Sequence, residues 1–392
     1  MPLRSSRTTA VALVTFATFT DICAYAIAVP VLPDLSRRLG ASATMIGFLF
    51  ASFGVTLLSV SIPMGAVSDR IGRRGPMVGG LVALSLASVL FAFATSLPWL
   101  FAARLVQGAA DAVTWVVGFA LIADLFGADE RGRMTGIVMS GTSFAFMVGP
   151  SIGGWLYELG GMRTPFLAVA ALAAIAAAAF AWFDPPDHRA EHDVVPIAAV
   201  LRTPAVVACT IAVVTASSTL SMLEPVVVLH LQTLGVGPAR VGLLFGISAL
   251  QNAIVHPAVG HLSDRHGSRR VMLLGLTLSA FALILFGQTW SFASTIPLQL
   301  VLAAAMALMI TPSLAYMAEA TSETGVGSFG VAYGIYNMAW GVGLLGGPAI
   351  GGFLFERMGF SRLVFLWAPA MLAVAAWLAR VESKPDLRGV ET

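Results

Sequence analysis

The stretch Gly65-Ala66-Val67-Ser68-Asp69-Arg70-Ile71-Gly72-Arg73-Arg74 decides the fold of this chain. It is a short charged turn, bounded by glycines, between two long apolar runs. A second copy begins 195 residues later and reads Gly260-His261-Leu262-Ser263-Asp264-Arg265-His266-Gly267-Ser268-Arg269-Arg270. A charged turn that recurs after half the chain length, between membrane-length segments, predicts a transporter built from two related halves.

The composition of the 392 residues is that of a membrane protein, since 58% are hydrophobic and only 11% are charged. A soluble protein carries roughly a quarter charged residues. The net charge of +2 is small and the arginines sit in turns, which argues against a nucleic-acid partner. Cys23 and Cys209 lie in apolar runs without metal-ligand spacing, so we expect no metal and no cofactor.

Twelve apolar runs have about the 20 residues that a helix needs to cross a bilayer. They lie near 10–33, 43–66, 75–95, 98–125, 134–158, 164–183, 204–232, 238–262, 270–289, 292–318, 328–356 and 361–380. The only extended charged stretch lies between the sixth run and the seventh. The sequence therefore predicts an all-α integral membrane protein with six-helix bundles at 1–183 and 204–392, joined by a linker at 184–203.

The lysines and arginines predict how the chain is oriented. Fifteen of them fall on the side of the N-terminus and six on the opposite side. Since cytoplasmic loops carry the excess of positive charge, we expect both termini and the linker to be cytoplasmic. We expect the chain to span the inner (cytoplasmic) membrane of the cell.

A glycine–proline motif is also duplicated: Gly149-Pro150-x-x-Gly153-Gly154 recurs as Gly347-Pro348-x-x-Gly351-Gly352. A glycine-lined helix face allows close packing at an interface between the halves, and proline bends the helix. Packing of small residues without any transport role is the alternative. The motif predicts that the fifth and eleventh spans lie where the halves meet.

Ionisable residues interrupt the apolar runs at Asp21, Arg104, Asp111 and Glu224. A charge inside a span is expensive unless it is paired or faces a water-filled cavity. Arg104, Gln107 and Asp111 share one helical face, so Arg104 is a candidate for proton coupling with Asp111 as its partner. A purely structural ion pair is the alternative.

Asp21 and Glu224 do not follow the repeat, whereas the scaffold glycines do. This asymmetry favours a function, although an incidental polar residue in a water-filled groove is the alternative. Burial disfavours the charged form of a carboxyl group, so such a group can carry a proton and exchange it for a cation. Tyr25, one turn from Asp21, could hold an organic cation through its ring. Pro225 directly follows Glu224 and favours a local break in the helix.

Together these motifs resemble the major facilitator superfamily over nearly the whole chain. The family's loop G-x-x-x-D-R-x-G-R-R is matched at Gly65, Asp69, Arg70, Gly72, Arg73 and Arg74. The resemblance implies that this turn, with Asp264 and Arg265 in the second copy, gates the transporter, and that Asp124 or Asp129 pairs with its arginines. Glycines in the turn let two helices approach closely. A positive turn that only sets the orientation in the membrane is the alternative.

Within the superfamily, the glycine–proline motif resembles the antiporter motif of proton-driven drug exporters, with Ala145 at its second glycine. Asp21-x8-Pro30-x-x-Pro33 and Leu223-Glu224-Pro225 resemble the vesicular amine transporters and their bacterial relatives. That resemblance implies that Asp21 and Glu224 contact a protonated amine. The amine carriers pair a lysine with an acid at the positions held here by Phe53 and Asn337. By its position, Asn337 is a further candidate for binding substrate or protons.

The expected function is proton-coupled export of hydrophobic, cationic drugs or amines by alternating access. We expect a monomer that interacts with a small-molecule substrate, protons and the lipid bilayer. A non-cationic substrate, such as a tetracycline-like drug or a metabolite, is the alternative. A membrane enzyme is disfavoured because the sequence contains no nucleophile elbow, HExxH motif or Walker loop.

Overall fold

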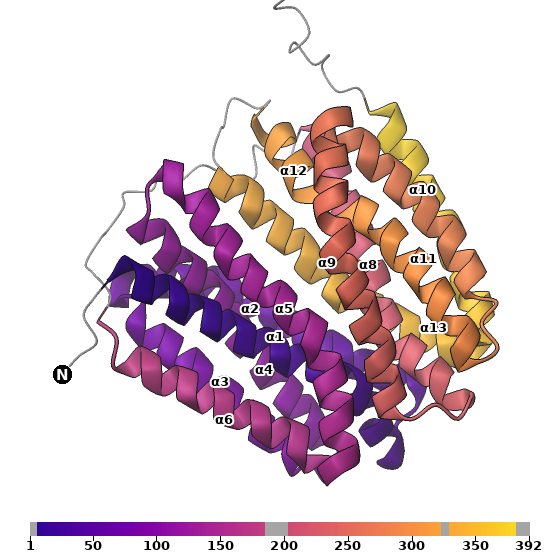
Figure 1. The fold of residues 1–392 in the computed structure, drawn as a ribbon, viewed down its shortest axis with the longest axis horizontal. Coiled ribbons are helices and arrows are strands. Elements are labelled where there is room, and N and C mark those ends of the chain that lie inside the picture. Colours follow the sequence, from indigo (N-terminus) through magenta and orange to yellow (C-terminus); the bar gives the residue numbers. More distant parts are fainter. Residues whose placement is uncertain (1–5, 185–202, 323–328, 382–392) are drawn as a thin grey trace, which may run out of the picture.

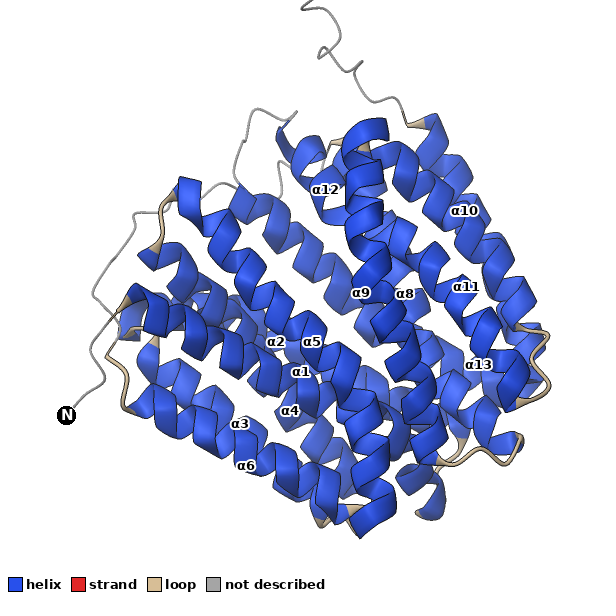
Figure 2. Cartoon of the chain, in the orientation of Figure 1, coloured by secondary structure: helices blue, strands red, loops and turns tan. Residues whose placement is uncertain are grey.

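The computed structural model describes residues 6–184, 203–322 and 329–381, and these residues form a helical protein (Figure 1 and Figure 2). The helices are α1 (Arg7–Arg38), α2 (Ala43–Ile71), α3 (Arg74–Ala92), α4 (Leu97–Leu125), α5 (Ala128–Gly160), α6 (Arg163–Ala181), α8 (Pro204–Thr233), α9 (Pro238–His266), α10 (Ser268–Phe286), α11 (Phe292–Ile310), α12 (Ser313–Ser322) and α13 (Phe329–Arg380). Among the described residues, eleven helical segments are long and apolar enough to cross a membrane.

The last of these segments, α13, comprises two spans. A straight helix of its 52 residues would be about 78 Å long, more than twice the thickness of a hydrocarbon core. Gly359 interrupts it with φ 75° and ψ 177°, and one helical segment, called an arm here, lies on each side of this residue. The arms correspond to the predicted runs 328–356 and 361–380, so the fold has the twelve expected spans.

The predicted run 292–318 is divided between α11 and α12. Pro312 lies in the gap, and proline cannot donate the backbone hydrogen bond that would continue α11. The linker predicted at 184–203 lies almost entirely outside the described residues, so its boundaries stay a prediction.

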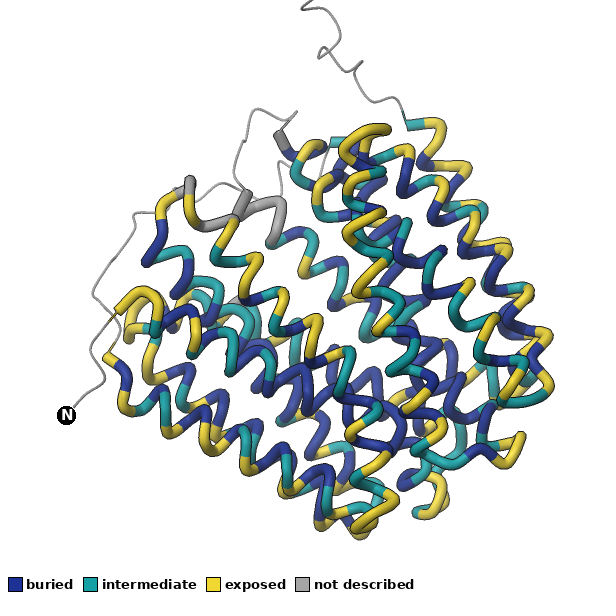
Figure 3. Tube along the Cα trace, viewed as in Figure 1, coloured by how far each residue is buried: buried dark blue, intermediate teal, exposed yellow. Residues whose placement is uncertain are grey.

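The helices form two bundles, α1–α6 and α8–α13 (Figure 1). The bundles meet where α2 packs on α13 and where α5 packs on α9. Figure 1 shows α5 and α9 converging at one end and diverging toward the other. Buried residues line the packed interior, while many residues on the outside of the bundles are exposed (Figure 3). Large apolar side chains such as Trp182 and Phe281 are among the exposed ones, as expected for a surface in contact with lipid.

Glycines at helix ends reveal the repeat in the backbone. In the described part of the chain, six glycines have positive φ, a conformation that costs other residues energy. They fall into three pairs at equivalent positions of the two halves: Gly40 with Gly235, Gly72 with Gly267, and Gly161 with Gly359. The duplication seen in the sequence is therefore also a duplication of helix boundaries.

Candidate functional site

The glycine–proline motif of the first half holds two helix contacts at once. A Cβ on Gly149 would lie 2.6 Å from the Cβ of Ala26, so this glycine seats α5 on α1, and Gly153 does the same one turn later. A Cβ on Gly154 would lie 2.7 Å from the carbonyl oxygen of Pro238, in α9 of the other bundle. The motif thus packs its helix within one bundle and across to the other.

The second copy repeats this arrangement. Gly347 packs on α8 of its own bundle, and Gly352 crosses to α2, where a Cβ would lie 2.8 Å from the Cα of Gly47. The carbonyl oxygens of the motif prolines contact glycines of the opposite bundle: Pro150 faces Gly242, and Pro348 faces Gly47. The motif lies where the halves meet, as the sequence predicts.

Glu224 and Tyr25 connect the two bundles in their buried interior. The Tyr25 hydroxyl, on α1, donates a hydrogen bond to Oε2 of Glu224, on α8. Both side chains are buried. The local break expected before Pro225 is absent, because α8 is one helix from Pro204 to Thr233. Glu224 is therefore held on a rigid element against the opposite bundle.

Arg104 lies beside this bond in a cage of aromatic rings. Its guanidinium carbon lies 5.0 Å from the ring centroid of Tyr25, 4.8 Å from that of Phe50 and 5.0 Å from that of Phe53. Its Nη1 donates to Oε1 of Gln107 at 2.7 Å. The residue is fully buried. A desolvated cation held by aromatic faces gains about 2 kcal/mol or more from each good contact.

Asp111 faces Asp21 rather than forming the expected ion pair with Arg104. The two carboxyl groups lie against each other between α1 and α4, with the indole of Trp115 beside both. Asp21 is 1% exposed and Asp111 is 6% exposed. Among the described residues no ion pair joins Asp111 to Arg104, although the charge of the arginine attracts the carboxylate electrostatically.

The structure therefore brings together five of the six residues predicted to bind substrate or protons: Asp21, Tyr25, Arg104, Asp111 and Glu224. The sixth, Asn337, is exposed on α13. Its neighbour Tyr336 is bonded to Ser313 of α12, whose hydroxyl lies 3.3 Å from the phenol oxygen. Phe53, which stands where the amine carriers have a lysine, is instead part of the arginine cage.

Arg73 is the centre of the first charged turn. Its Nε lies 2.7 Å from a carboxylate oxygen of Asp124, and its Nη1 lies 2.6 Å from Asp69. The same Nη1 donates to the hydroxyl of Ser68 at 2.6 Å. The predicted pairing with Asp124 is confirmed, while the side chain of Asp129 lies outside the described part of the chain. The turn thus ties the end of α2 to the end of α4.

The glycines of this turn differ in their roles. Gly72 has φ 87°, so the turn requires a residue that tolerates the left-handed region. A Cβ on Gly65 would meet only Val116, at an ordinary 3.7 Å, so the close helix approach expected at this glycine is not observed. Arg70 is exposed.

The second charged turn keeps the arrangement with a serine in place of the arginine. Ser268 donates to Glu319 at 3.0 Å, and Ser263 donates to Ser268 at 3.3 Å. These residues hold the repeat positions of Arg73, Asp124 and Ser68. Asp264 and Arg265, predicted to gate, are exposed. The two turns are therefore related in geometry and different in charge.

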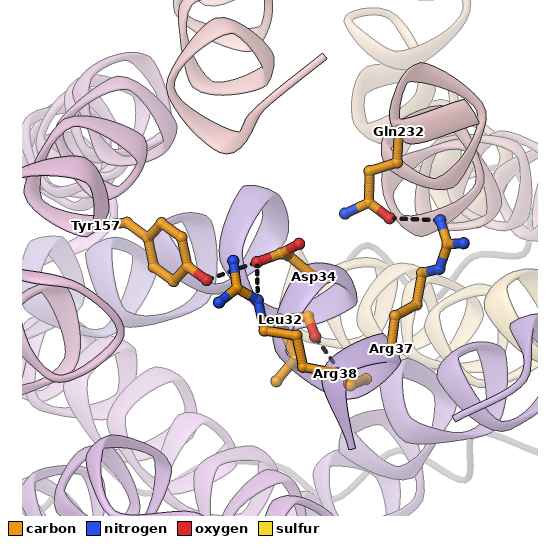
Figure 4. A network of polar contacts seen from close by, with 7 residues as sticks. Leu32, Asp34, Arg37, Arg38, Tyr157 and Gln232 are labelled. Atoms are coloured by element: carbon orange, nitrogen blue, oxygen red, sulfur yellow. Dashed lines mark hydrogen bonds and ion pairs between the residues drawn. The ribbon is translucent and has the colours of Figure 1, made fainter. Parts of the chain in front are cut away.

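A polar network lies where α1 ends, at the end of the bundles opposite to the charged turns. Figure 4 shows its side chains. Asp34 accepts from the hydroxyl of Tyr157 at 2.5 Å and from Nε of Arg38 at 3.0 Å. Arg37 donates to Oε1 of Gln232 at 3.1 Å. Arg37 and Gln232 are 195 residues apart and occupy equivalent positions in the repeat, so the two halves touch there along their pseudo-symmetry axis.

Two acids lie at helix N-termini of the opposite bundle at this same end. Glu356 of α13 accepts from the backbone N–H of Thr44, in the first turn of α2, at 2.7 Å. Glu158 of α5 lies next to Gly237, the N-cap residue of α9. A carboxylate is favourable at a helix N-terminus because the free N–H groups and the helix dipole attract negative charge. This end of the protein is held together from both sides.

Comparison with known proteins identifies the fold. The family model of the Major Facilitator Superfamily matches residues 14–231 and 206–391. The chain belongs to the major facilitator superfamily. Among solved facilitators, a bacterial homologue of the human lysosomal transporter Spinster, in an inward-facing and occupied conformation, superposes with a TM-score of 0.82 at 14% identity over 96% of this chain and 97% of that one. A mutant of the nucleoside transporter NupG superposes with a TM-score of 0.77 at 14% identity, over 94% of this chain and 99% of that one.

Curated facilitators with similar sequences are carriers of vesicle membranes. The vesicular acetylcholine transporter of Drosophila melanogaster is 26% identical over 97% of this chain and 72% of its own length. The chromaffin granule amine transporter of Homo sapiens is 26% identical over 87% of this chain and 66% of its own length. This chain thus spans about two thirds to three quarters of these relatives. It is a multi-pass membrane transporter and not an enzyme.

The sequence indicated the charged residues of this facilitator's site but not the side chains that they contact. Phe50 and Phe53 read as ordinary apolar positions of a span, and only the cage around Arg104 gives them a role. Glu158 and Glu356 did carry a signal, because they occupy equivalent positions after the glycine–proline motif.

Proposed function

We propose that this facilitator is a proton-coupled antiporter that exports hydrophobic, cationic compounds, amines or drugs among them. The proposal rests on one observation: the buried site contains three carboxyl groups and one guanidinium. With every group ionised, its net charge is −2, and charge excess at membrane depth is strongly unfavourable. Protons or a cation must therefore neutralise it, and competition between the two is the basis of exchange.

Two further observations support a cation as the substrate. Glu224 belongs to one bundle and Asp21 to the other, so a ligand between them would be held by both halves, as alternating access requires. The related carriers named above transport acetylcholine or other amines, by their names.

The proposed orientation places both termini on the cytoplasmic side of the inner membrane, by the distribution of arginine and lysine. The end closed by Arg37 and Glu356 then faces away from the cytoplasm, and the described conformation is inward-facing. In this proposal the charged turns around Arg73 and Asp264 gate the cytoplasmic side, and the bundles 1–183 and 204–392 rock as units of a monomer.

Purified protein in liposomes with an imposed pH gradient tests the proposal. Lipophilic amines are added while the internal pH is followed, for wild type, Asp21→Asn and Glu224→Gln. Glu130→Gln, which removes an exposed carboxyl at the start of α5, is the matched control. We expect amine-induced proton flux in wild type and the control and its loss in both site variants.

Flux that survives in both site variants would remove Asp21 and Glu224 from the coupling path. If no amine evokes flux but a neutral or anionic drug does, the substrate is non-cationic, and the cation proposal is refuted while antiport stands.

A further inference from the structure

We propose that Asp21 and Asp111 form a carboxyl pair that shares one proton, and that this pair is a proton site separate from Glu224. Its role in transport rests on the proposed function, whereas the shared proton itself does not. The sequence places Asp111 seven residues after Arg104 and suggests an ion pair. The fold turns Asp111 toward α1 instead.

Within the described ranges, no cation is bonded to the pair. Neither oxygen of Asp21 makes a hydrogen bond of adequate geometry to a donor in the described residues. α5 packs on α1 beside it with Ala145 and the motif glycines, which are not titratable. The groups that face the pair are Trp115, beside both carboxyls, and Arg104 and Tyr25, which interact electrostatically with Asp111.

The chemistry of two facing carboxyl groups requires a proton. An ionised carboxylate only accepts hydrogen bonds, so two carboxylates in contact offer each other no donor. Two negative charges in contact in a dry site repel each other. One of the two carboxyl groups therefore takes up a proton, as in other buried carboxyl dyads. The protonated oxygen then donates to the other carboxylate, which satisfies the otherwise unpartnered oxygen of Asp21.

The shared proton determines how much charge the rest of the site must accept. The pair then carries −1, Glu224 carries −1 and Arg104 carries +1, which leaves −1 in the centre. One further positive charge makes the site neutral, whether it is a proton on Glu224 or a monovalent organic cation. The pair therefore selects for substrates with a single charge and leaves Glu224 as the group that exchanges.

The position of both aspartates in one bundle explains why the proton stays in the pair. Asp21 lies within the N-terminal bundle, as does Asp111, so movement of one bundle against the other leaves their contact intact. The bond between Tyr25 and Glu224 crosses from bundle to bundle and does not share this protection.

Infrared difference spectroscopy on the reconstituted, substrate-free protein tests the pair directly. A carboxylic acid has a C=O band that shifts in D₂O and that ionised carboxylates lack. Wild type, Asp21→Asn, Asp111→Asn and Glu224→Gln are compared across a pH titration, and thermal unfolding confirms that each variant is folded. We expect one band that disappears in both aspartate variants and persists in Glu224→Gln.

A band that persists in Asp111→Asn would place the proton on Asp21 alone and overturn the pair. So would the absence of any band that depends on Asp21. If a variant does not fold, the wild-type spectrum decides: a shared proton gives a broad, low-frequency band, and a sharp, high-frequency band refutes sharing. Because no substrate is added, the band can be present when amine transport fails, which separates this inference from the proposed function.

Discussion

Gly352→Ala should weaken the contact that closes one end of this transporter. The new Cβ would lie 2.8 Å from the Cα of Gly47 and closer still to the carbonyl oxygen of Ala43. Both neighbours are backbone atoms of α2, so neither can rotate away. The only relief is separation of α2 from α13, which belong to different bundles.

The magnitude follows from two opposing terms. Inserting a methyl group into a packed contact costs about 1–3 kcal/mol. Alanine is also better than glycine in a helix by up to about 1 kcal/mol, but that gain is the same in every conformation of α13. The clash exists only where the helices touch, so it alone shifts the conformational equilibrium, by roughly 5- to 150-fold away from the described state.

Gly346→Ala is the matched control on the same helix, because a Cβ on Gly346 meets nothing within 4 Å. Spin labels at Leu159 and Trp290, which are 64% and 72% exposed on opposite bundles, report the opening of this end by double electron–electron resonance. We expect longer distances in Gly352→Ala only. Equal distance distributions in both variants would refute the argument that backbone contact at this glycine holds the bundles together.

Two further predictions concern single contacts and are measured by thermal unfolding in detergent. Asp124→Asn removes the buried carboxylate that pairs with Arg73 and should destabilise the protein by about 1–3 kcal/mol. Asp69→Asn removes a carboxylate that is 64% exposed and should change stability by less than about 0.5 kcal/mol. Equal losses of stability in the two variants would contradict the pairing in the structure. Tyr25→Phe keeps the aromatic ring beside Arg104 but loses the hydroxyl bonded to Glu224, so the free energy of unfolding should fall by about 1–3 kcal/mol. An unchanged unfolding midpoint would mean that this bond does not hold the bundles together.

Much of the fold could be predicted because each span must satisfy its backbone hydrogen bonds within itself. Apolar run length then reveals a helix without knowledge of its neighbours, and the observed helices overlap all twelve predicted runs. Details that depend on one backbone group were not predicted. Pro312 splits the tenth run, whereas Pro225 leaves α8 continuous. A proline in a span breaks the helix only where its surroundings satisfy the freed groups in another way.

The candidate site could be predicted in its charges but not in its contacts. Asp21, Arg104 and Glu224 stand out because ionisable residues are rare in apolar runs. Periodicity along one helix suggested that Arg104 pairs with Asp111, since it describes only residues of the same face. In the fold, Asp111 faces Asp21 of α1, and Arg104 lies among rings of α1 and α2 while it donates to Gln107 of its own helix. The rotation of a helix in a bundle is set by close packing of small residues, which hydropathy does not register.

The scaffold is duplicated and the site is not, and this difference assigns separate tasks to the acids. Equivalent residues close the end where Arg37 meets Gln232, so the halves can separate there symmetrically. The centre has no such symmetry: one bundle provides the carboxyl pair and Arg104, and the other provides Glu224. Any rocking of the bundles must stretch or break the bond to Glu224, whereas contacts inside one bundle are preserved. Glu224 is therefore the acid whose surroundings alternate, and an exchange of proton for cation requires a group whose surroundings alternate.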